Sequence, residues 1–167
     1  MRTLTEIESC ALARPGIRNF DIRFTQWLAA HSVTLLRVGI GIVFLWFGAL
    51  KFFPGLSPAE ALVGQTIGKM TFGLVPPTVA TIFTAALESL IGLGLLTGRY
   101  LRLTLLMLGT QMLGTLAPLF LFPEQTFASF PFVPTLEGQY ILKNVVLIAG
   151  AMVVGSTVRG GRLTPED

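Results

Sequence analysis

Charged residues and metal-binding side chains are both scarce in this chain. Of its 167 residues, 13% are charged and 52% are hydrophobic, and the mean hydropathy is +0.72. Soluble domains carry about 25% charged residues, so this composition indicates an integral membrane protein. Cys10 is the only cysteine and His31 the only histidine. The chain alone can therefore form no disulfide, zinc site or bis-histidine haem site, and we expect no metal and no intrinsic cofactor.

Four apolar segments are long enough to cross a bilayer. They cover residues 33–53, 78–97, 101–122 and 135–158, and a membrane helix needs about 20 residues. We therefore predict an all-α fold, an integral membrane four-helix bundle over residues 33–158. Residues 1–32 are predicted to form a cytoplasmic tail and an interfacial amphipathic helix, and residues 159–167 a second cytoplasmic tail.

The distribution of arginine predicts the topology in the membrane. The net charge is only +3, and no pattern in the chain indicates nucleic-acid binding. Cytoplasmic segments of membrane proteins are rich in Lys and Arg. Arginines lie before the first span, between the second and third, and after the fourth, at Arg2, Arg14, Arg18, Arg23, Arg99, Arg102, Arg159 and Arg162. We therefore expect a multi-pass protein with both termini in the cytoplasm.

The connections between the spans carry their own signals. A short helix over residues 58–74 is predicted after the first span, as a cap along the interface. A loop over 123–134 is rich in proline and phenylalanine. Thr135 is expected to cap the fourth helix, and Glu137 favours its positive end. His31, just before the first span, is interpreted as an interfacial residue, with a lone axial ligand to haem or pigment as the alternative. No role follows for Cys10.

Three charged residues lie inside the first two predicted spans. Arg37 and Lys51 share one face of the first span, and Glu88 lies near the middle of the second. Isolated charges in a membrane are costly, and depths counted from the span ends bring Arg37 and Glu88 together. We therefore predict a buried Arg37–Glu88 pair. The pair would either serve function or only fix the helix register.

A second set of polar residues is predicted near the outer side. Lys51 and Lys143 are expected at similar depth, where they could face one pocket and bind an anionic or carbonyl-bearing ligand. Tyr140 could stack on a ring. The alternative is that both lysines extend to the interface and that Tyr140 anchors the helix there.

The sequence resembles one family in three stretches: RVGIGIVFLWFGALKF, ALESLIGLGLLTGRYLRLTLLML and EGQYILKNVVLIAGA. These stretches are similar to the DoxX-like membrane proteins, and the resemblance covers most of residues 34–158. It implies a small four-helix protein of a bacterial inner membrane, associated with quinone-linked oxidoreductases of thiosulfate or with resistance to oxidative stress. The family's pattern in the first two spans falls on Arg37, Gly41, Phe44, Gly48, Lys51, Glu88, Gly92 and Gly94.

Together these features lead to one main hypothesis and two alternatives. The main hypothesis is a small integral subunit of a redox or stress-resistance assembly that binds a quinone-like ring at Lys51, Lys143 and Tyr140. The first alternative is a non-catalytic accessory subunit that docks onto a larger membrane protein complex. A transporter ranks third, because no internal repeat or broken helix is expected. Whether the protein is an enzyme, and its oligomeric state, do not follow from the sequence.

Overall fold

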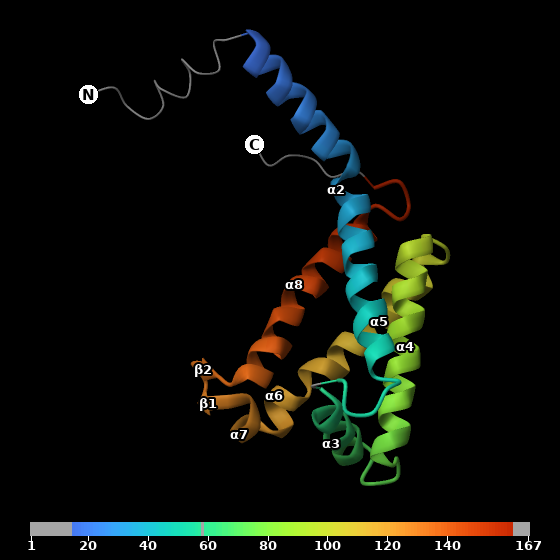
Figure 1. The fold of residues 1–167 in the computed structure, drawn as a ribbon, viewed down its shortest axis with the longest axis vertical. Coiled ribbons are helices and arrows are strands. Elements are labelled where there is room, and N and C mark those ends of the chain that lie inside the picture. Colours follow the sequence, from blue (N-terminus) through green and yellow to red (C-terminus); the bar gives the residue numbers. More distant parts are fainter. Residues whose placement is uncertain (1–14, 58, 162–167) are drawn as a thin grey trace, which may run out of the picture. The chain divides into compact units, whose positions relative to one another are not determined.

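The computed structural model describes residues 15–57 and 59–161. Cys10 and the last residues of the predicted C-terminal tail lie outside the described residues. The elements, in chain order, are α2 (Pro15–Leu50), α3 (Glu60–Met70), α4 (Pro77–Thr97), α5 (Leu101–Leu116), α6 (Pro118–Leu121), α7 (Pro123–Thr126), β1 (Phe127–Ser129), β2 (Val133–Pro134) and α8 (Leu136–Ser156) (Figure 1).

The prediction of an all-α protein with four membrane-spanning helices is confirmed. Among the described residues, four helices are long and apolar enough to cross a bilayer: Arg18–Leu50, Pro77–Thr97, Leu101–Leu121 and Leu136–Ser156. The remaining helices and the two-stranded sheet are short connections. The protein is therefore a multi-pass membrane protein in contact with the lipid bilayer.

The chain divides into two units, which meet between Leu35 and Leu36 within helix α2. In the first unit, the helix is continuous through the segment predicted to be amphipathic. Phe20 stacks on Phe24 with ring centroids 6.0 Å apart, and Trp27 stacks on His31 at 4.9 Å. His31 Nδ1 donates to the carbonyl oxygen of Trp27 at 2.9 Å. His31 therefore interacts within its own helix, and the position of this segment on the membrane surface stays a prediction.

The second unit closes a ring of four helices. Helix α5 contacts both α4 and α8. The Leu36–Leu50 part of α2 completes the ring, because Gly150 of α8 lies beside Ile40 and Gly92 of α4 lies beside Leu45. The apolar core of this ring consists of Ile40, Phe44, Ile91, Leu95, Leu108, Met112 and Ala151.

Glycines set the contact between α2 and α4. A Cβ atom built at Gly92 would lie 2.5 Å from the backbone nitrogen of Leu45, and one at Gly48 would lie 2.9 Å from Cβ of Glu88. A Cβ at Gly41 would lie 3.1 Å from Cβ of Leu95. Small residues allow membrane helices to approach this closely. The three contacts define an antiparallel register in which Gly48 lies opposite Glu88.

The third span is interrupted near its end. Helix α5 ends at Leu116, and α6 begins at Pro118. Proline has no amide hydrogen to continue the helical ladder, so the break at Ala117 follows from the sequence. It is a difference from the expectation that no span would be broken.

The predicted short helix after the first span is present as α3, but it is shorter than expected. It covers Glu60–Met70, and Glu60 Oε2 accepts a hydrogen bond from the backbone nitrogen of Gly55 at 2.8 Å. At the other end, Lys69 Nζ donates to the carbonyl oxygen of Leu121 at 2.8 Å and lies 4.5 Å from the centre of the Phe122 ring. The first contact ties the start of α3 to the loop before it, and the contacts of Lys69 attach its end to α6 and Phe122.

The predicted cap of the fourth span is confirmed. Thr135 is the N-cap residue of α8, and its Oγ1 accepts a hydrogen bond from the backbone nitrogen of Gly138 at 3.2 Å. The same oxygen donates to the carbonyl oxygen of Gln125 at 2.7 Å. The loop before α8 contains α7 and an antiparallel pair of strands, β1 and β2. Thr135 therefore ties this loop to the start of the helix.

Candidate functional site

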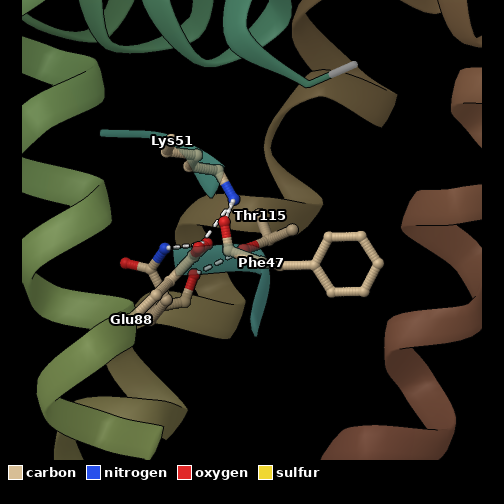
Figure 2. Close-up of polar contacts among 5 residues, drawn as sticks. Phe47, Lys51, Glu88 and Thr115 are labelled. Carbon is tan, nitrogen blue, oxygen red and sulfur yellow. Dashed lines mark hydrogen bonds and ion pairs between the residues drawn. The ribbon is translucent and has the colours of Figure 1, made fainter. Parts of the chain in front are cut away.

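A buried ion pair joins the end of α2 to the middle of α4. Lys51 Nζ lies 2.6 Å from Glu88 Oε2, and the two side chains are 6% and 13% exposed. Lys51 Nζ also lies 3.4 Å from the carbonyl oxygen of Phe47, in the last turn of α2. Figure 2 shows the ammonium group pointing at both oxygens. A cation at a helix C-terminus is favoured by the helix dipole, so Lys51 is held by two partners at once.

Helix α5 supplies a third member of this cluster. Gln111 Nε2 donates to Glu88 Oε1 at 3.3 Å, so both carboxylate oxygens accept hydrogen bonds. One turn later, Thr115 Oγ1 donates to the backbone carbonyl of Gln111 at 2.9 Å. We call Lys51, Glu88 and Gln111 the polar cluster. It links three spans at one depth.

The predicted Arg37–Glu88 pair is wrong. Arg37 Nη1 instead donates to the carbonyl oxygen of Leu95, and it lies 3.4 Å from that of Leu96. The guanidinium also lies against Gly98, which has a φ of +70° and ends α4. The last carbonyl oxygens of a helix lack partners within the helix, and Arg37 satisfies two of those in α4.

The contact register explains why Lys51 replaces Arg37. Gly48 lies opposite Glu88, and Lys51 follows Gly48 by about one helical turn. Arg37 precedes Gly48 by eleven residues, which is about 16 Å along the axis at ~1.5 Å per residue. An arginine side chain does not cover that distance.

Lys143 and Tyr140 lie apart from the polar cluster. Both side chains are exposed on α8, with Tyr140 56% exposed, and Lys143 Nζ lies 5.3 Å from the centre of the Tyr140 ring. Lys51 is 8% exposed. The structure therefore does not bring Lys51 and Lys143 to one pocket, and the expectation that two lysines share a site is wrong.

Ser89 leaves one polar atom of this region without a partner. Its Oγ is buried, and it makes no hydrogen bond to any described residue. A Cβ atom built at Gly48 would lie 2.9 Å from this oxygen, so the hydroxyl points toward α2, next to Glu88 in the sequence. Buried polar atoms in proteins are nearly always hydrogen-bonded. The hydroxyl of Ser89 is therefore an exception, enclosed at the contact between α2 and α4.

Two cavities lie outside the polar cluster. The larger, of about 710 Å³, lies between α3 and the first half of α4 and includes Gln65 and Thr81 among its lining residues. The smaller, of about 310 Å³, is apolar and lies along α2, where Trp46 and Phe53 line it. Neither is lined by Lys51, Lys143 or Tyr140.

Sequence reasoning missed two parts of this arrangement. Gln111 shares a polar face of the third span with Thr104 and Thr115, and that face is the signal that could have identified it as a partner of Glu88. The groove under α3 depends on how α3 lies on α4, which no local pattern specifies.

In chemical terms, the polar cluster can donate and accept hydrogen bonds. The ammonium of Lys51 is a donor, the carboxylate of Glu88 is an acceptor, and the amide of Gln111 is both. Within the described residues, no three His, Cys, Asp or Glu side chains come close enough to hold a metal ion. The arrangement suits binding through hydrogen bonds.

Comparison with known proteins identifies the family. A family model described as DoxX matches residues 32–122, more than half of the chain. The match includes Arg37 and all three residues of the polar cluster, and it ends before α8. No curated protein and no solved structure matches the chain significantly. On the strength of the family match, this four-span membrane protein belongs to the DoxX family.

Proposed function

We propose that the protein is a small integral subunit of a redox or stress-resistance assembly and binds a quinone-like lipophilic ring beside the polar cluster. The observation that carries this proposal is the ion pair between Lys51 and Glu88 inside the membrane-spanning bundle. Charged groups are rare in membrane spans and typically mark ligand or proton pathways. A pair that also binds Gln111 is polar enough to receive the oxygen atoms of such a ring.

The residues of the cluster fit such a ligand. A ring carbonyl accepts hydrogen bonds, which Lys51 and Gln111 can donate, and a ring hydroxyl donates to Glu88. A bound quinone supplies two-electron redox chemistry. The protein's own part is to hold the ring and to exchange a proton between Glu88 and its neighbours.

A binding experiment tests this function. The protein purified in lipid nanodiscs is expected to bind a short-chain benzoquinone saturably, and solvent extracts of it to contain quinone. A Lys51→Met, Glu88→Leu double variant should bind about tenfold more weakly, because a hydrogen bond to a charged group contributes about 1.5–3 kcal/mol. The matched control is Lys143→Met, which removes an exposed lysine and should leave binding unchanged. Absence of any saturable binding by the unaltered protein would contradict the proposal.

A second candidate function has its own supporting observation. The apolar groove of about 310 Å³ on α2 is lined by Ile42, Trp46, Phe53 and neighbouring side chains, and Trp46 is 66% exposed. Such a surface could seat a helix of a larger membrane complex, as an accessory subunit would require. In that case the protein should co-purify with a partner, and the Lys51→Met, Glu88→Leu variant should retain that partner.

The proposed orientation places both termini on the cytoplasmic side of a bacterial inner membrane. Arg37 lies against Gly98, and Leu105 lies beside Gly155, so Arg99, Arg102 and Arg159 lie toward one end of the bundle. Lys and Arg favour the cytoplasmic side.

Thiol labelling tests this orientation. With Cys10 replaced by serine, single cysteines at Arg99 or Arg159 should resist an impermeant reagent in intact cells. A cysteine at Glu124, which is exposed, should react. The reverse pattern of labelling would invert the topology.

A further inference from the structure

The groove between α3 and α4 has the size and lining of a ligand pocket. Its volume is about 710 Å³, within the range of about 300–1,000 Å³ that small-molecule pockets occupy. Figure 1 shows α3 beside the N-terminal half of α4, and the two helices contact each other. Five polar side chains line the groove: Ser57, Glu60, Gln65, Thr78 and Thr81.

The helix surface that forms the groove carries glycines in place of side chains. Gly64 packs against α4, because a Cβ atom built there would lie 2.9 Å from Cβ of Pro77. One turn later, a Cβ atom built at Gly68 would meet no atom within 4 Å, although Gly68 lines the groove. The α3 side of the groove is therefore bare backbone at Gly68, against which a flat ring can lie.

The wall of the groove that α3 forms is held in place. Helix α3 is anchored at Glu60 by the bond from the Gly55 nitrogen and at Lys69 by the Leu121 carbonyl and the Phe122 ring. A pocket whose walls are already fixed loses less freedom on binding, which favours affinity.

Glu60 decides which form of a ring the groove accepts. Among the described residues that line it, Glu60 is the one that carries a charge. A carboxylate only accepts hydrogen bonds, whereas Ser, Thr and Gln side chains both donate and accept. Glu60 Oε2 is already bound to the Gly55 nitrogen. Its other oxygen would attract a ring hydroxyl and repel a ring carbonyl, so the lining favours the reduced, hydroxyl-bearing ring.

A row of polar residues on one face of α4 leads from the groove to the polar cluster. Thr81 lines the groove and is buried, Thr84 is buried one turn later, and Glu88 follows after another turn. Residues with this spacing share one side of a helix. The distance from Thr81 to Glu88 is about 10 Å along the axis at ~1.5 Å per residue.

We propose that the groove between α3 and α4 is a second site, separate from the polar cluster, that binds the hydroquinone form of the ring, with Glu60 accepting a ring hydroxyl and Thr81 marking the end nearest Glu88. This inference rests on the proposed function, which places a ring beside the polar cluster, and adds a second place that favours the reduced form. No electron transfer is part of it.

Binding of three related probes tests the redox form. The probes are a short-chain benzoquinol kept anaerobic, its benzoquinone and its dimethyl ether, each titrated against the protein in nanodiscs. The quinol should bind about tenfold more tightly than the other two, because only it donates to a carboxylate. In Glu60→Gln this preference should vanish, while the amide oxygen can still accept the Gly55 bond. A preference that persists in Glu60→Gln overturns the role of Glu60.

A space-filling variant tests the place. Gly68→Leu puts a side chain into open space in the groove and improves the helix propensity of α3, so it should fold and reduce quinol affinity at least ~tenfold. The matched control is Gly109→Leu, on α5, where a Cβ atom also meets no atom within 4 Å.

The outcomes separate this inference from the function on which it rests. If the quinol binds Gly68→Leu as it binds Gly109→Leu, the groove is not a binding site, and the proposed function at the polar cluster stands. If no form of the ring binds the unaltered protein, both proposals fall.

Discussion

Replacement of Glu88 by leucine alone is expected to remove most of the protein from the membrane. The change leaves the ammonium of Lys51 buried with only the Phe47 carbonyl as partner. Removal of one partner of a buried ion pair costs about 3–5 kcal/mol. Lys51→Met alone should cost a similar amount, because Glu88 then keeps only the bond from Gln111. Membrane abundance and thermal unfolding of purified protein measure both effects.

The double variant provides the critical comparison. Lys51→Met with Glu88→Leu should recover much of the lost stability, because apolar residues can replace a buried pair at little cost. Arg37→Leu with Glu88→Leu should show no such recovery, since Arg37 binds the carbonyls of α4 instead. If the Arg37 combination recovered stability and the Lys51 combination did not, the observed pairing would be refuted.

The second large effect is expected from Gly92→Ala. A methyl group there would lie 2.5 Å from the backbone nitrogen of Leu45 and 2.7 Å from its Cβ. Neither atom can turn aside as the end of a long side chain can, so α2 and α4 must separate. Overpacking of this kind costs about 1–3 kcal/mol or more, and it should lower the midpoint of thermal unfolding.

Alanine substitutions at two other glycines serve as controls for this prediction. Gly41→Ala should cost less, because its Cβ would lie 3.1 Å from side-chain atoms of Leu95 and Leu96. Gly114→Ala meets no atom within 4 Å and should be neutral or slightly stabilising. Equal unfolding midpoints for the Gly92 and Gly114 variants would show that α2 and α4 are not in close contact.

The sequence was sufficient for the number of spans, for the limits of the last three and for one helix cap. Apolar length depends on the bilayer alone, so the expected segments 78–97 and 101–122 agree closely with the spans Pro77–Thr97 and Leu101–Leu121. Thr135 was predictable as an N-cap because its signal is local. The break at Ala117 was also open to prediction, since Pro118 is visible in the sequence.

The partner of Glu88 was not predictable in the same way. Alignment of the expected limits 33–53 and 78–97 would place Glu88 opposite Val43, which is nearer to Arg37 than to Lys51. The structure places it opposite Gly48, a shift of about one and a half helical turns. That shift comes from the fit of glycines against the facing helix, which is a tertiary property. The sequence correctly predicted that Glu88 pairs with a cation of the first span. Arg37 was chosen in place of Lys51 because the predicted register of the two helices was wrong.

The groove between α3 and α4 was not predictable for a different reason. Gln65, Gly68 and Thr81 look ordinary in the sequence, and they line one space only because Gly64 packs on Pro77. Lys69 lies in the segment that was predicted as a cap along the interface, and in the structure it binds the end of α6. Contacts between elements that are far apart in the chain decide both features.

The two cation contacts also restrict how the bundle can move. Arg37 holds α2 to the end of α4, Lys51 holds it to the middle, and the glycine contacts join the backbones between them. A sliding motion of one helix along the other would break both contacts and force Leu45 past Gly92. The Leu36–Leu50 part of α2 and helix α4 therefore behave as one rigid body. An opening that admits a ligand therefore comes from elements other than this pair.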